Sequence, residues 1–440
     1  MKIGQENARI ISKDTEVTTT SMDEIRVLGG YKLKGRVAAG GSKNATLPLL
    51  AATLLAPGTY RFTNVPELKD VSTMLEMLSR FGITSRRSGD HELTVDSTNS
   101  HNAEAPYELV KTMRASIYVL GPLLARYGEA RVSLPGGCAW GPRPVDLHIR
   151  AMEALGAKVE IDHGYIVATA PDGLRGGSIS FDVSSVGATG NLLLAAATAA
   201  GRTVVENAAC EPEIQALCEF LVAMGAKIEG ICKPQLIIHG VPELHPADAP
   251  MIPDRIEIGT LLVAAAITGG DVEVTGVDLT HLGATLSKLE ATGASIEVAP
   301  DSVRLRAPER PEPISVTTRP FPGFPTDMQA QFMALLSVGN GASTIVDTIY
   351  HDRFTHVAEL QRLGADIRLD GNTAHVHGVP SLSGAQVMAT DLRASAALIL
   401  AGLIASGETR VSRVYHLDRG YERLEQKLQA LGASIRRVKA

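Results

Sequence analysis

One phrase recurs six times along the chain: an amphipathic stretch, then a glycine, then a short run rich in β-branched residues. About 70 residues separate successive copies, a period typical of a repeated supersecondary unit. We expect each glycine to end a helix in the left-handed conformation, with a strand following immediately. The glycines are Gly82, Gly156, Gly225, Gly293, Gly364 and Gly432. The chain should therefore fold as six copies of one α/β unit.

A second phrase, also present six times, is a polar or charged opening followed by an apolar run rich in alanine and leucine. Because these runs are apolar almost all round, they predict helices that are buried on every side. The runs open at Lys43, Arg114, Gly187, Arg255, Thr326 and Leu392. Each repeat then holds one buried helix, one amphipathic helix and several strands. Three repeats in each of two domains would enclose the apolar helices within sheets and amphipathic helices.

The repeats also predict how the chain divides. At 440 residues it exceeds one ordinary hydrophobic core, and the proline-marked stretch 241–254 falls where the third repeat ends. Residues 1–25 are polar and weakly periodic, and we expect a loosely ordered extension there. Residues 43–252 are assigned to a domain with repeats one to three. Residues 26–42 plus 253–440 are assigned to a domain with repeats four to six.

Composition and net charge limit the classes of binding partner that the chain can be expected to have. Hydrophobic residues make up 45% of the chain and aromatic residues only 4%, which predicts a core of small and aliphatic side chains. A formal net charge of -6 gives no electrostatic reason to expect nucleic acid or an anionic membrane as partner. No apolar run reaches the roughly 18 residues of a membrane span, and the N-terminus lacks the apolar stretch of a secretion signal. We expect a cytoplasmic protein whose anion sites are local.

Of the four cysteines, Cys138 has a distinctive setting. The four are too few and too scattered for a disulfide framework, and none forms a CxxC metal pair. Cys138 lies in the glycine- and proline-rich loop 134–148, where flanking glycines would expose it and Arg143 would lower its pKa. It is the candidate reactive thiol, on a loop suited to be a lid. The others, Cys210, Cys218 and Cys232, are expected to be small buried hydrophobes.

Charged side chains stand where several of the buried helices should begin. A helix N-terminus carries partial positive charge, so an added Lys or Arg is unfavourable there unless an anion compensates. Taken together, these openings favour an anion-binding cleft between the domains, while interdomain salt bridges or solvated caps are the alternatives. Arg353 and Arg419, in two further loop-like segments, add guanidinium groups suited to phosphate or carboxylate. The charged openings are Lys43, Arg114, Arg255, Asp327 and Arg393.

Several longer segments resemble the UDP-N-acetylglucosamine enolpyruvyl transferases, and the resemblance covers about residues 26–438. The segments are GSKNATLPLL, MRASIYVLGPL, LPGGC followed by GPRPVDLH, SVGAT, NAACEPEI, PDRIE, GFPTDMQAQ, DLRASAAL and YHLDRGYERLE. The resemblance implies an inside-out α/β barrel of two domains, with three βαβαββ-type repeats in each, that closes over its substrates. It implies transfer of the enolpyruvyl group of phosphoenolpyruvate to the 3-hydroxyl of UDP-N-acetylglucosamine through a tetrahedral ketal, with release of phosphate. No metal or other cofactor is implied.

Roles for individual residues are likewise implied by the resemblance. Asp327 would be the base for the sugar hydroxyl, and Cys138 the loop acid that can add to phosphoenolpyruvate and is the target of fosfomycin; Lys43 and Arg419 would complete the catalytic set. The phosphoenolpyruvate site would comprise Lys43, Arg143 and Arg419 on the phosphate, Arg353 and Arg393 on the carboxylate, and Asn44 and Arg114 beside them. The nucleotide-sugar site would comprise Asn44, Arg114, Arg143, Pro144, Val145, Asp146, Leu147, Ser185, Val186, Gly187, Asp327 and Ile349.

The chain also departs from the family pattern. Trp140 and Pro142 stand in the cysteine loop where relatives usually carry small or aliphatic residues, and Val183 and Phe321 stand where some members have Lys and His. These changes bear on substrate identity more than on reaction type. Two alternatives therefore remain: an enolpyruvyl transferase acting on another nucleotide in a specialised pathway, and a catalytically silent paralogue that binds nucleotide sugar and regulates a partner.

Overall fold

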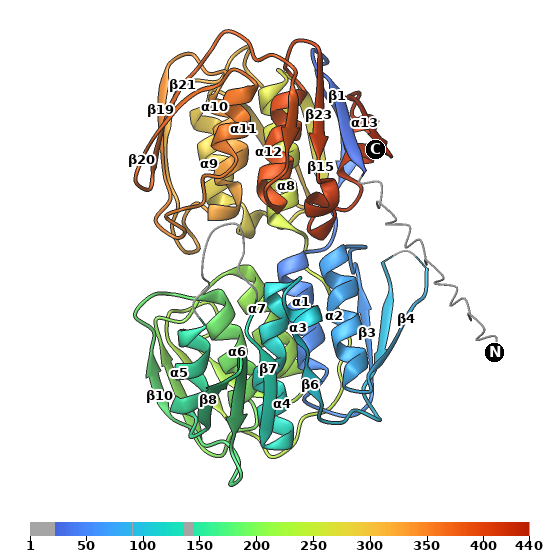
Figure 1. Ribbon diagram of the computed structural model, residues 1–440, viewed down its shortest axis with the longest axis vertical. Helices are drawn as coiled ribbons and strands as arrows, with labels where there is room; N and C mark the ends of the chain where they lie inside the picture. Colours follow the sequence, from blue (N-terminus) through green and yellow to red (C-terminus); the bar gives the residue numbers. More distant parts are fainter. Residues whose placement is uncertain (1–22, 90, 136–144, 440) are drawn as a thin grey trace, which may run out of the picture.

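The computed structural model describes residues 23–89, 91–135 and 145–439. Figure 1 shows two lobes stacked along the long axis, one holding α1 to α7 and the other α8 to α13. Five residues discussed above, Cys138, Trp140, Pro142, Arg143 and Pro144, lie outside the described residues.

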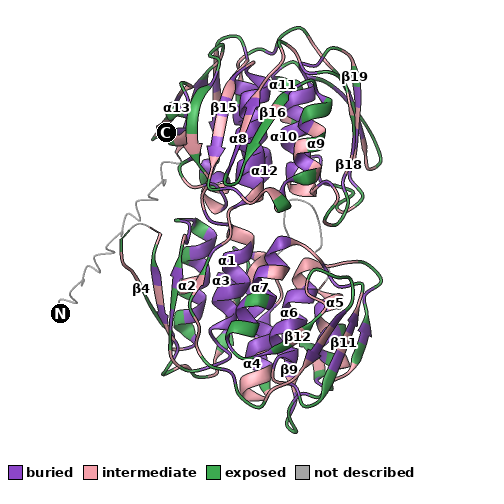
Figure 2. Ribbon diagram, turned by 180° about the vertical axis from the view of Figure 1, so that it is seen from behind, coloured by how far each residue is buried: buried purple, intermediate pink, exposed green. Residues whose placement is uncertain are grey.

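The predicted buried helices all form. They are α1 (Lys43–Ala52), α4 (Leu120–Tyr127), α6 (Val186–Ala196), α8 (Arg255–Ile267), α10 (Gln329–Leu336) and α12 (Leu392–Gly402). Figure 2 shows them as the buried centre of each lobe. In α8, every residue from Ile256 to Ile267 is buried, as the lack of a polar face predicts.

Two of these helices begin later than the sequence suggested, after 3-10 turns at η1 (Arg114–Val119) and η3 (Thr326–Met328). Pro122 is the third residue of α4, in the first turn, where its missing N–H leaves no intrahelical hydrogen bond unmade. The peripheral helices are α2 (Lys69–Arg80), α5 (Asp146–Ala154), α7 (Pro212–Ala223), α9 (Gly283–Ala291), α11 (Val357–Arg362) and α13 (Leu424–Ala430). Short elements complete the set: α3 (Tyr107–Val110), η2 (Leu279–His281) and η4 (Val414–Arg419).

The six repeat glycines end peripheral helices in the left-handed conformation, as predicted. Their φ angles are 76° at Gly82, 87° at Gly156, 105° at Gly225, 89° at Gly293, 96° at Gly364 and 99° at Gly432. A strand starts two residues after each of them. The glycine therefore reverses the chain from helix to strand at the same point in every repeat.

The described residues form six four-stranded sheets, one for each repeat. The sheets of the first lobe are β14 (Ala249–Pro250), β3 (Thr59–Thr63), β5 (Leu93–Asp96), β4 (Thr84–Arg87); β6 (Glu104–Ala105), β7 (Glu129–Ser133), β9 (Tyr165–Thr169), β8 (Lys158–Asp162); and β10 (Ser178–Ser180), β11 (Arg202–Glu206), β13 (Leu236–His239), β12 (Lys227–Glu229). Those of the second are β16 (Ser295–Ala299), β17 (Ser302–Arg306), β15 (Asp271–Thr275), β2 (Lys34–Ala38); β18 (Ser315–Thr317), β19 (Ala342–Val346), β21 (Thr373–His377), β20 (Asp366–Asp370); and β22 (Gln386–Met388), β23 (Glu408–Ser412), β1 (Glu24–Leu28), β24 (Ser434–Val438).

The N-terminal strands belong to the second lobe. β1 pairs with β23 and β24, and β2 pairs in parallel with β15. One buried apolar cluster runs from Leu47 to Met251, and the other combines Ile25, Val27 and Leu33 with residues 256–435. We propose the division 43–252 against 26–42 plus 253–440 on these grounds, with β1 extending it to Glu24.

The chain passes between the lobes along two neighbouring segments, which form an isolated antiparallel bridge between Gly41 and Pro253. The Ser42 N–H donates to the Ile252 carbonyl at 2.7 Å, and the Asp254 N–H donates to the Gly40 carbonyl at 2.9 Å. Within the described ranges, none of the helices has the length and apolar character that crossing a membrane requires.

Asn191 is the polar link between buried helices, and we predict that Asn191→Leu lowers the free energy of unfolding by roughly 2–4 kcal/mol. Its Oδ1 accepts from the Gly121 N–H at 2.7 Å, and its Nδ2 donates to the Ile117 carbonyl at 2.9 Å. Leucine leaves the buried Gly121 N–H without its acceptor and removes one of the two donors to the Ile117 carbonyl, which also accepts from the Leu120 N–H. Urea unfolding measures the change, and Asn340→Leu at an exposed position is the control, expected to stay within about 0.5 kcal/mol. Equal losses in the two variants would contradict the assignment.

Candidate functional site

The helix starts of the two lobes meet around Asp70, a buried carboxylate in the first turn of α2. Lys43, the first residue of α1, places its Nζ 3.4 Å from Asp70 Oδ2. Arg419, at the end of η4 in the other lobe, places its Nε 2.8 Å from Asp70 Oδ1. Asp70 thus joins two predicted phosphate-binding cations across the lobes. The sequence analysis missed it, because a carboxylate in the first turn of a helix is too common to mark a site.

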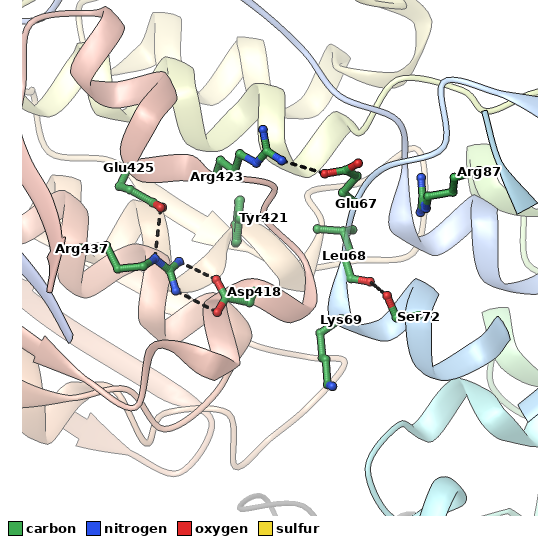
Figure 3. A pocket seen from close by; sticks show the side chains of 10 residues that line it. All are labelled: Glu67, Leu68, Lys69, Ser72, Arg87, Asp418, Tyr421, Arg423, Glu425 and Arg437. Atoms are coloured by element: carbon green, nitrogen blue, oxygen red, sulfur yellow. Dashed lines mark hydrogen bonds and ion pairs between the residues drawn. The ribbon is translucent and has the colours of Figure 1, made fainter. Parts of the chain in front are cut away.

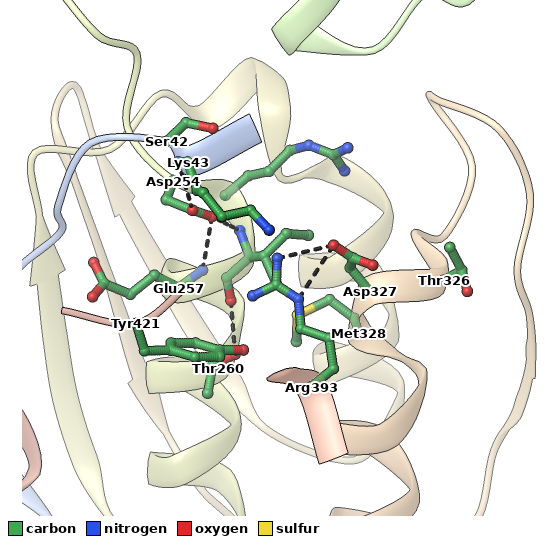
Figure 4. A network of polar contacts seen from close by, with 12 residues as sticks. Ser42, Lys43, Asp254, Glu257, Thr260, Thr326, Asp327, Met328, Arg393 and Tyr421 are labelled. Atoms are coloured by element: carbon green, nitrogen blue, oxygen red, sulfur yellow. Dashed lines mark hydrogen bonds and ion pairs between the residues drawn. The ribbon is translucent and has the colours of Figure 1, made fainter. Parts of the chain in front are cut away.

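A second cluster forms around Asp327 in η3. Arg353 Nη1 lies 2.7 Å from its Oδ1, and Arg393 approaches Oδ2 with Nη2 at 2.9 Å and Nε at 3.2 Å. Figure 4 shows Asp327 and Arg393 facing each other, with Lys43 beside them and Tyr421 below. Arg393 is almost entirely buried, at 1% exposure, and its guanidinium lies over the Tyr421 ring at 5.2 Å. Among the described residues, its Nη1 is a buried donor without a hydrogen-bond partner.

The two clusters act on each other electrostatically. Burial would raise the pKa of Asp327, but Arg393, Arg353 and Lys43 outweigh it and hold that pKa well below 3.8. Burial lowers the pKa of Lys43 from 10.5; Asp70 opposes this, whereas Arg393 and Arg419 add to it. Lys43 therefore lies within reach of both clusters, so the predicted cations and Asp327 form one site.

The residues predicted for the nucleotide sugar lie at the starts of α5 and α6 and, from the other lobe, at η3 and after β19. Val145, Asp146 and Leu147 begin α5, while Ser185, Val186 and Gly187 begin α6. Ser185 caps α6, since its side chain accepts from the Ala188 N–H at 3.3 Å. The His148 ring packs on Gly187, where an added Cβ would lie 3.2 Å from it. The two helix starts are therefore neighbours.

Arg114 and Tyr350 connect the lobes beside this region. Arg114 Nη1 donates to the Tyr350 hydroxyl at 3.2 Å, and both side chains are partly exposed. Tyr350 directly follows Ile349, the predicted nucleotide-sugar contact after β19. Asn44, the second residue of α1, is half-buried next to Lys43. The described members of the predicted set thus come together from both lobes.

Arg255 has a different role from the anion-binding one that its position suggested. It forms a two-pronged ion pair with Glu213 of the other lobe, with Nε 3.1 Å from Oε1 and Nη2 3.3 Å from Oε2. Its guanidinium also lies over the Phe321 ring at 5.9 Å. For this helix start, the interdomain salt bridge is the correct interpretation. Val183, another departure from the family pattern, is exposed.

A cavity of about 510 Å³ lies between the lobes next to this site, and Tyr421 borders both. Figure 3 shows the side chains that line the cavity. Its walls include Lys69 and Asp418, the chain neighbours of Asp70 and Arg419, and ion pairs such as Glu67 with Arg423 at 2.9 Å. None of the described residues predicted to bind substrate lines this cavity. We therefore place the candidate site at the two carboxylate clusters.

The expectation for the three other cysteines is correct only in part. All three are free thiols, but only Cys218 is buried, while Cys210 is half-buried and Cys232 is exposed. Cys232 has a φ of 65° and lies in the turn between β12 and β13, where no core can cover it. A hydrophobic residue type in a short hairpin turn was thus misread as core.

Solved structures share this architecture. The enolpyruvyl transferase NikO from Streptomyces tendae is 28% identical with a TM-score of 0.86, covering 96% of this chain and 100% of that one. An EPSP synthase from Acinetobacter baumannii, 19% identical, has the same fold with a TM-score of 0.74, covering 94% of this chain and 100% of that one. The fold and the site therefore define a protein of the enolpyruvyl transferase class, an inside-out α/β barrel of two domains.

The chain belongs to the EPSP synthase (3-phosphoshikimate 1-carboxyvinyltransferase) family, whose model matches residues 27–428. Similar proteins named UDP-N-acetylglucosamine 1-carboxyvinyltransferase occur in several bacteria. The one from Prosthecochloris aestuarii is 57% identical over 94% of this chain and 98% of its own length. The one from Desulfosudis oleivorans is 56% identical over 95% of this chain and 100% of its own length.

His148 should make the protein sensitive to acid. Burial, with a smaller effect from Arg114, lowers its pKa to about 3. In the unfolded chain the imidazole binds a proton below about pH 6.5, so stability falls as the pH drops from 7 toward 3. Between pH 7 and pH 5 this amounts to about 2 kcal/mol, which His148→Gln should abolish in urea unfolding.

The matched control for that prediction is His375→Gln, at an exposed position on β21. His375 is exposed and the substitution leaves the burial of His148 unchanged, so this variant should keep the wild-type dependence on pH. If His148→Gln keeps it too, neutral burial of His148 is not a source of acid sensitivity.

Proposed function

We propose that this protein transfers the enolpyruvyl group of phosphoenolpyruvate to the 3-hydroxyl of UDP-N-acetylglucosamine and releases phosphate, the first committed step of peptidoglycan precursor synthesis. The observation that carries the proposal is the buried Nη1 of Arg393, which has no hydrogen-bond partner among the described residues although the same guanidinium pairs with Asp327. A buried guanidinium N–H without an acceptor is costly, and an anionic substrate would supply that acceptor. Relatives that are 54–57% identical over almost the whole chain support the same reaction.

The arrangement assigns a task to each cluster. Arg353 and Arg393 take the carboxylate of phosphoenolpyruvate, while Lys43 and Arg419, with Arg143 of the loop, take its phosphate. In the described structure Arg353 and Arg393 are paired with Asp327, and Lys43 and Arg419 with Asp70. Substrate must therefore compete with protein carboxylates for them.

This competition affects the base. Asp327 is a poor base while two guanidinium groups hold its pKa low. When the substrate carboxylate takes over those groups, the pKa of Asp327 rises and the carboxylate can accept the proton of the sugar hydroxyl. Cys138 donates the proton that C3 of phosphoenolpyruvate gains in the tetrahedral ketal, and its thiolate then takes a proton back from C3 as the ketal expels phosphate into the cationic cluster. The sugar nucleotide lies along the starts of α5 and α6, with Ile349 opposite them.

Phosphate release from phosphoenolpyruvate tests the reaction. Wild type should release phosphate with UDP-N-acetylglucosamine and much less with UMP. Cys138→Ala should lose on the order of a hundredfold or more in rate, because a positioned acid is removed. Cys138→Asp should keep activity and lose inhibition by fosfomycin. Release with UMP alone would instead support an enzyme of a specialised nucleotide pathway, an alternative kept open by Val183 and Phe321.

Arg393→Lys tests the carboxylate site. An ammonium cannot present two parallel donors, so kcat/KM for phosphoenolpyruvate should fall on the order of a hundredfold, while binding of the sugar nucleotide changes little. The matched control is Arg410→Lys, at a half-buried arginine of β23 that pairs with Glu408 at 2.8 Å. It should retain wild-type kinetics, and an equal loss there would remove the support for a specific role of Arg393.

A further inference from the structure

Asp347 is a fully buried carboxylate directly after β19 that the sequence analysis did not single out. Its Oδ1 accepts from the Thr318 hydroxyl at 2.8 Å and from the N–H groups of Ile349 and Tyr350 at 3.0 and 2.9 Å. Its Oδ2 accepts from the Thr326 hydroxyl at 2.7 Å. The Asp347 side chain therefore joins three segments of the second lobe: the end of β18, the start of η3 and the turn at 349–350.

The repeats show that the fold does not need a charge at this position. β3, β11 and β19 occupy the same place in their sheets, each paired in parallel with a short edge strand. The residue after β3 is Asn64, and the residue after β11 is Asn207. Their Nδ2 groups donate to carbonyls beyond the neighbouring edge strand, at 3.0 Å to Met251 and 2.8 Å to Phe181. A neutral amide thus suffices to tie the strand end in two repeats.

In the fifth repeat a carboxylate replaces the amide, and burying a carboxylate costs free energy that an amide does not. The carboxylate also has additional partners. Asn64, Asn207 and Asp347 each bond the residue directly beyond the edge strand, Asp347 through the Thr318 hydroxyl, but Asp347 also accepts from Thr326 and from the turn that follows it. The carboxylate therefore does more than tie the strand end.

The polarity of the hydrogen bonds indicates what it serves. A carboxylate can only accept, so the Thr326 hydroxyl must give its single proton to Asp347. The oxygen of Thr326 is then left as an acceptor, and Arg353 Nη1 donates to it at 3.1 Å. The same Nη1 donates to Asp327 Oδ1 at 2.7 Å. The two hydrogens of one nitrogen are thus directed to two neighbouring residues, and Asp347 fixes the first of those bonds.

We propose that Asp347 is a positioning residue for the transfer reaction: through Thr326 it fixes Arg353 against Asp327, and through the turn at 349–350 it places Ile349. The inference rests on the proposed function and assigns to it two residues, Asp347 and Thr326, that touch no reacting atom. It explains why the carboxylate is buried beside the site although asparagine serves the fold elsewhere.

Four variants test the proposal. Asp347→Asn keeps the shape of the side chain and introduces the residue type found in two other repeats, but its amide would donate toward Thr326 and turn that hydroxyl away. Thr326→Val removes the hydroxyl, and Thr326→Ser keeps it. Thr348→Val is the matched control, because the Thr348 hydroxyl lies in the same turn but donates to the Thr318 carbonyl.

In steady-state phosphate release, Asp347→Asn and Thr326→Val should each lower kcat on the order of tenfold to a hundredfold. The double variant should lose no more than the larger single loss, because both act through one chain of bonds. Thr326→Ser and Thr348→Val should stay near wild type. The acid limb of the kcat/KM profile should move to higher pH in Asp347→Asn. Arg353, Arg393 and Lys43 lower the pKa of Asp327, and a misplaced Arg353 would lower this pKa less.

Amide hydrogen exchange in the protein without substrate separates this proposal from the proposed function. Exchange at Ile349 and Tyr350 should be faster in a further variant, Asp347→Ala, than in wild type, because this change removes the Oδ1 that accepts from both N–H groups, whether or not the protein releases phosphate. Absence of phosphate release by wild type would contradict the proposed function. The exchange rates would still show whether Asp347 orders the turn at 349–350. Wild-type kcat and pH profile in Asp347→Asn and Thr326→Val, or an equal loss in Thr348→Val, would overturn the positioning role.

Discussion

Helices that are apolar on every side can be covered only by other parts of the protein, and this requirement organises the whole molecule. Each lobe buries three such helices within sheets and amphipathic helices. Their sides are fully occupied, so only their ends remain available to a substrate. The starts of α1, α10 and α12, with the 3-10 turns beside them, meet between the lobes and carry the charged side chains of the site.

Charge placed at those ends is balanced in pairs. Lys43 and Arg419 share Asp70, Arg353 and Arg393 share Asp327, and Arg255 pairs with Glu213. Buried ion pairs of this kind gain little net stability, because the cost of removing charges from water offsets their attraction. What they provide is a set of cations already held in place, which an anion of suitable shape can take over from the carboxylates.

The fold and much of the site could be predicted from the sequence because short stretches of sequence indicate both. Glycines at a fixed period revealed the helix ends, and unbroken apolar runs revealed the buried helices. The partners could not be predicted in the same way. Asp70 and Asp347 are single carboxylates whose importance comes from residues far away in the chain, such as Arg419 and Thr326, and no local spacing records those contacts. Residue type alone also misplaced Cys232, because a hairpin turn has no interior.

The pairing of β1 and β2 with strands near the other end of the chain has a consequence for synthesis on the ribosome. Residues 43–252 are continuous, so the first lobe can complete its sheets and its core as soon as they emerge. The second lobe cannot, because its first two strands are made at the start and must wait for β15, β23 and β24. The lobe that contributes Asp327, Arg353 and Arg393 thus becomes complete only when the last strand has left the ribosome, and until then the protein has half of its site.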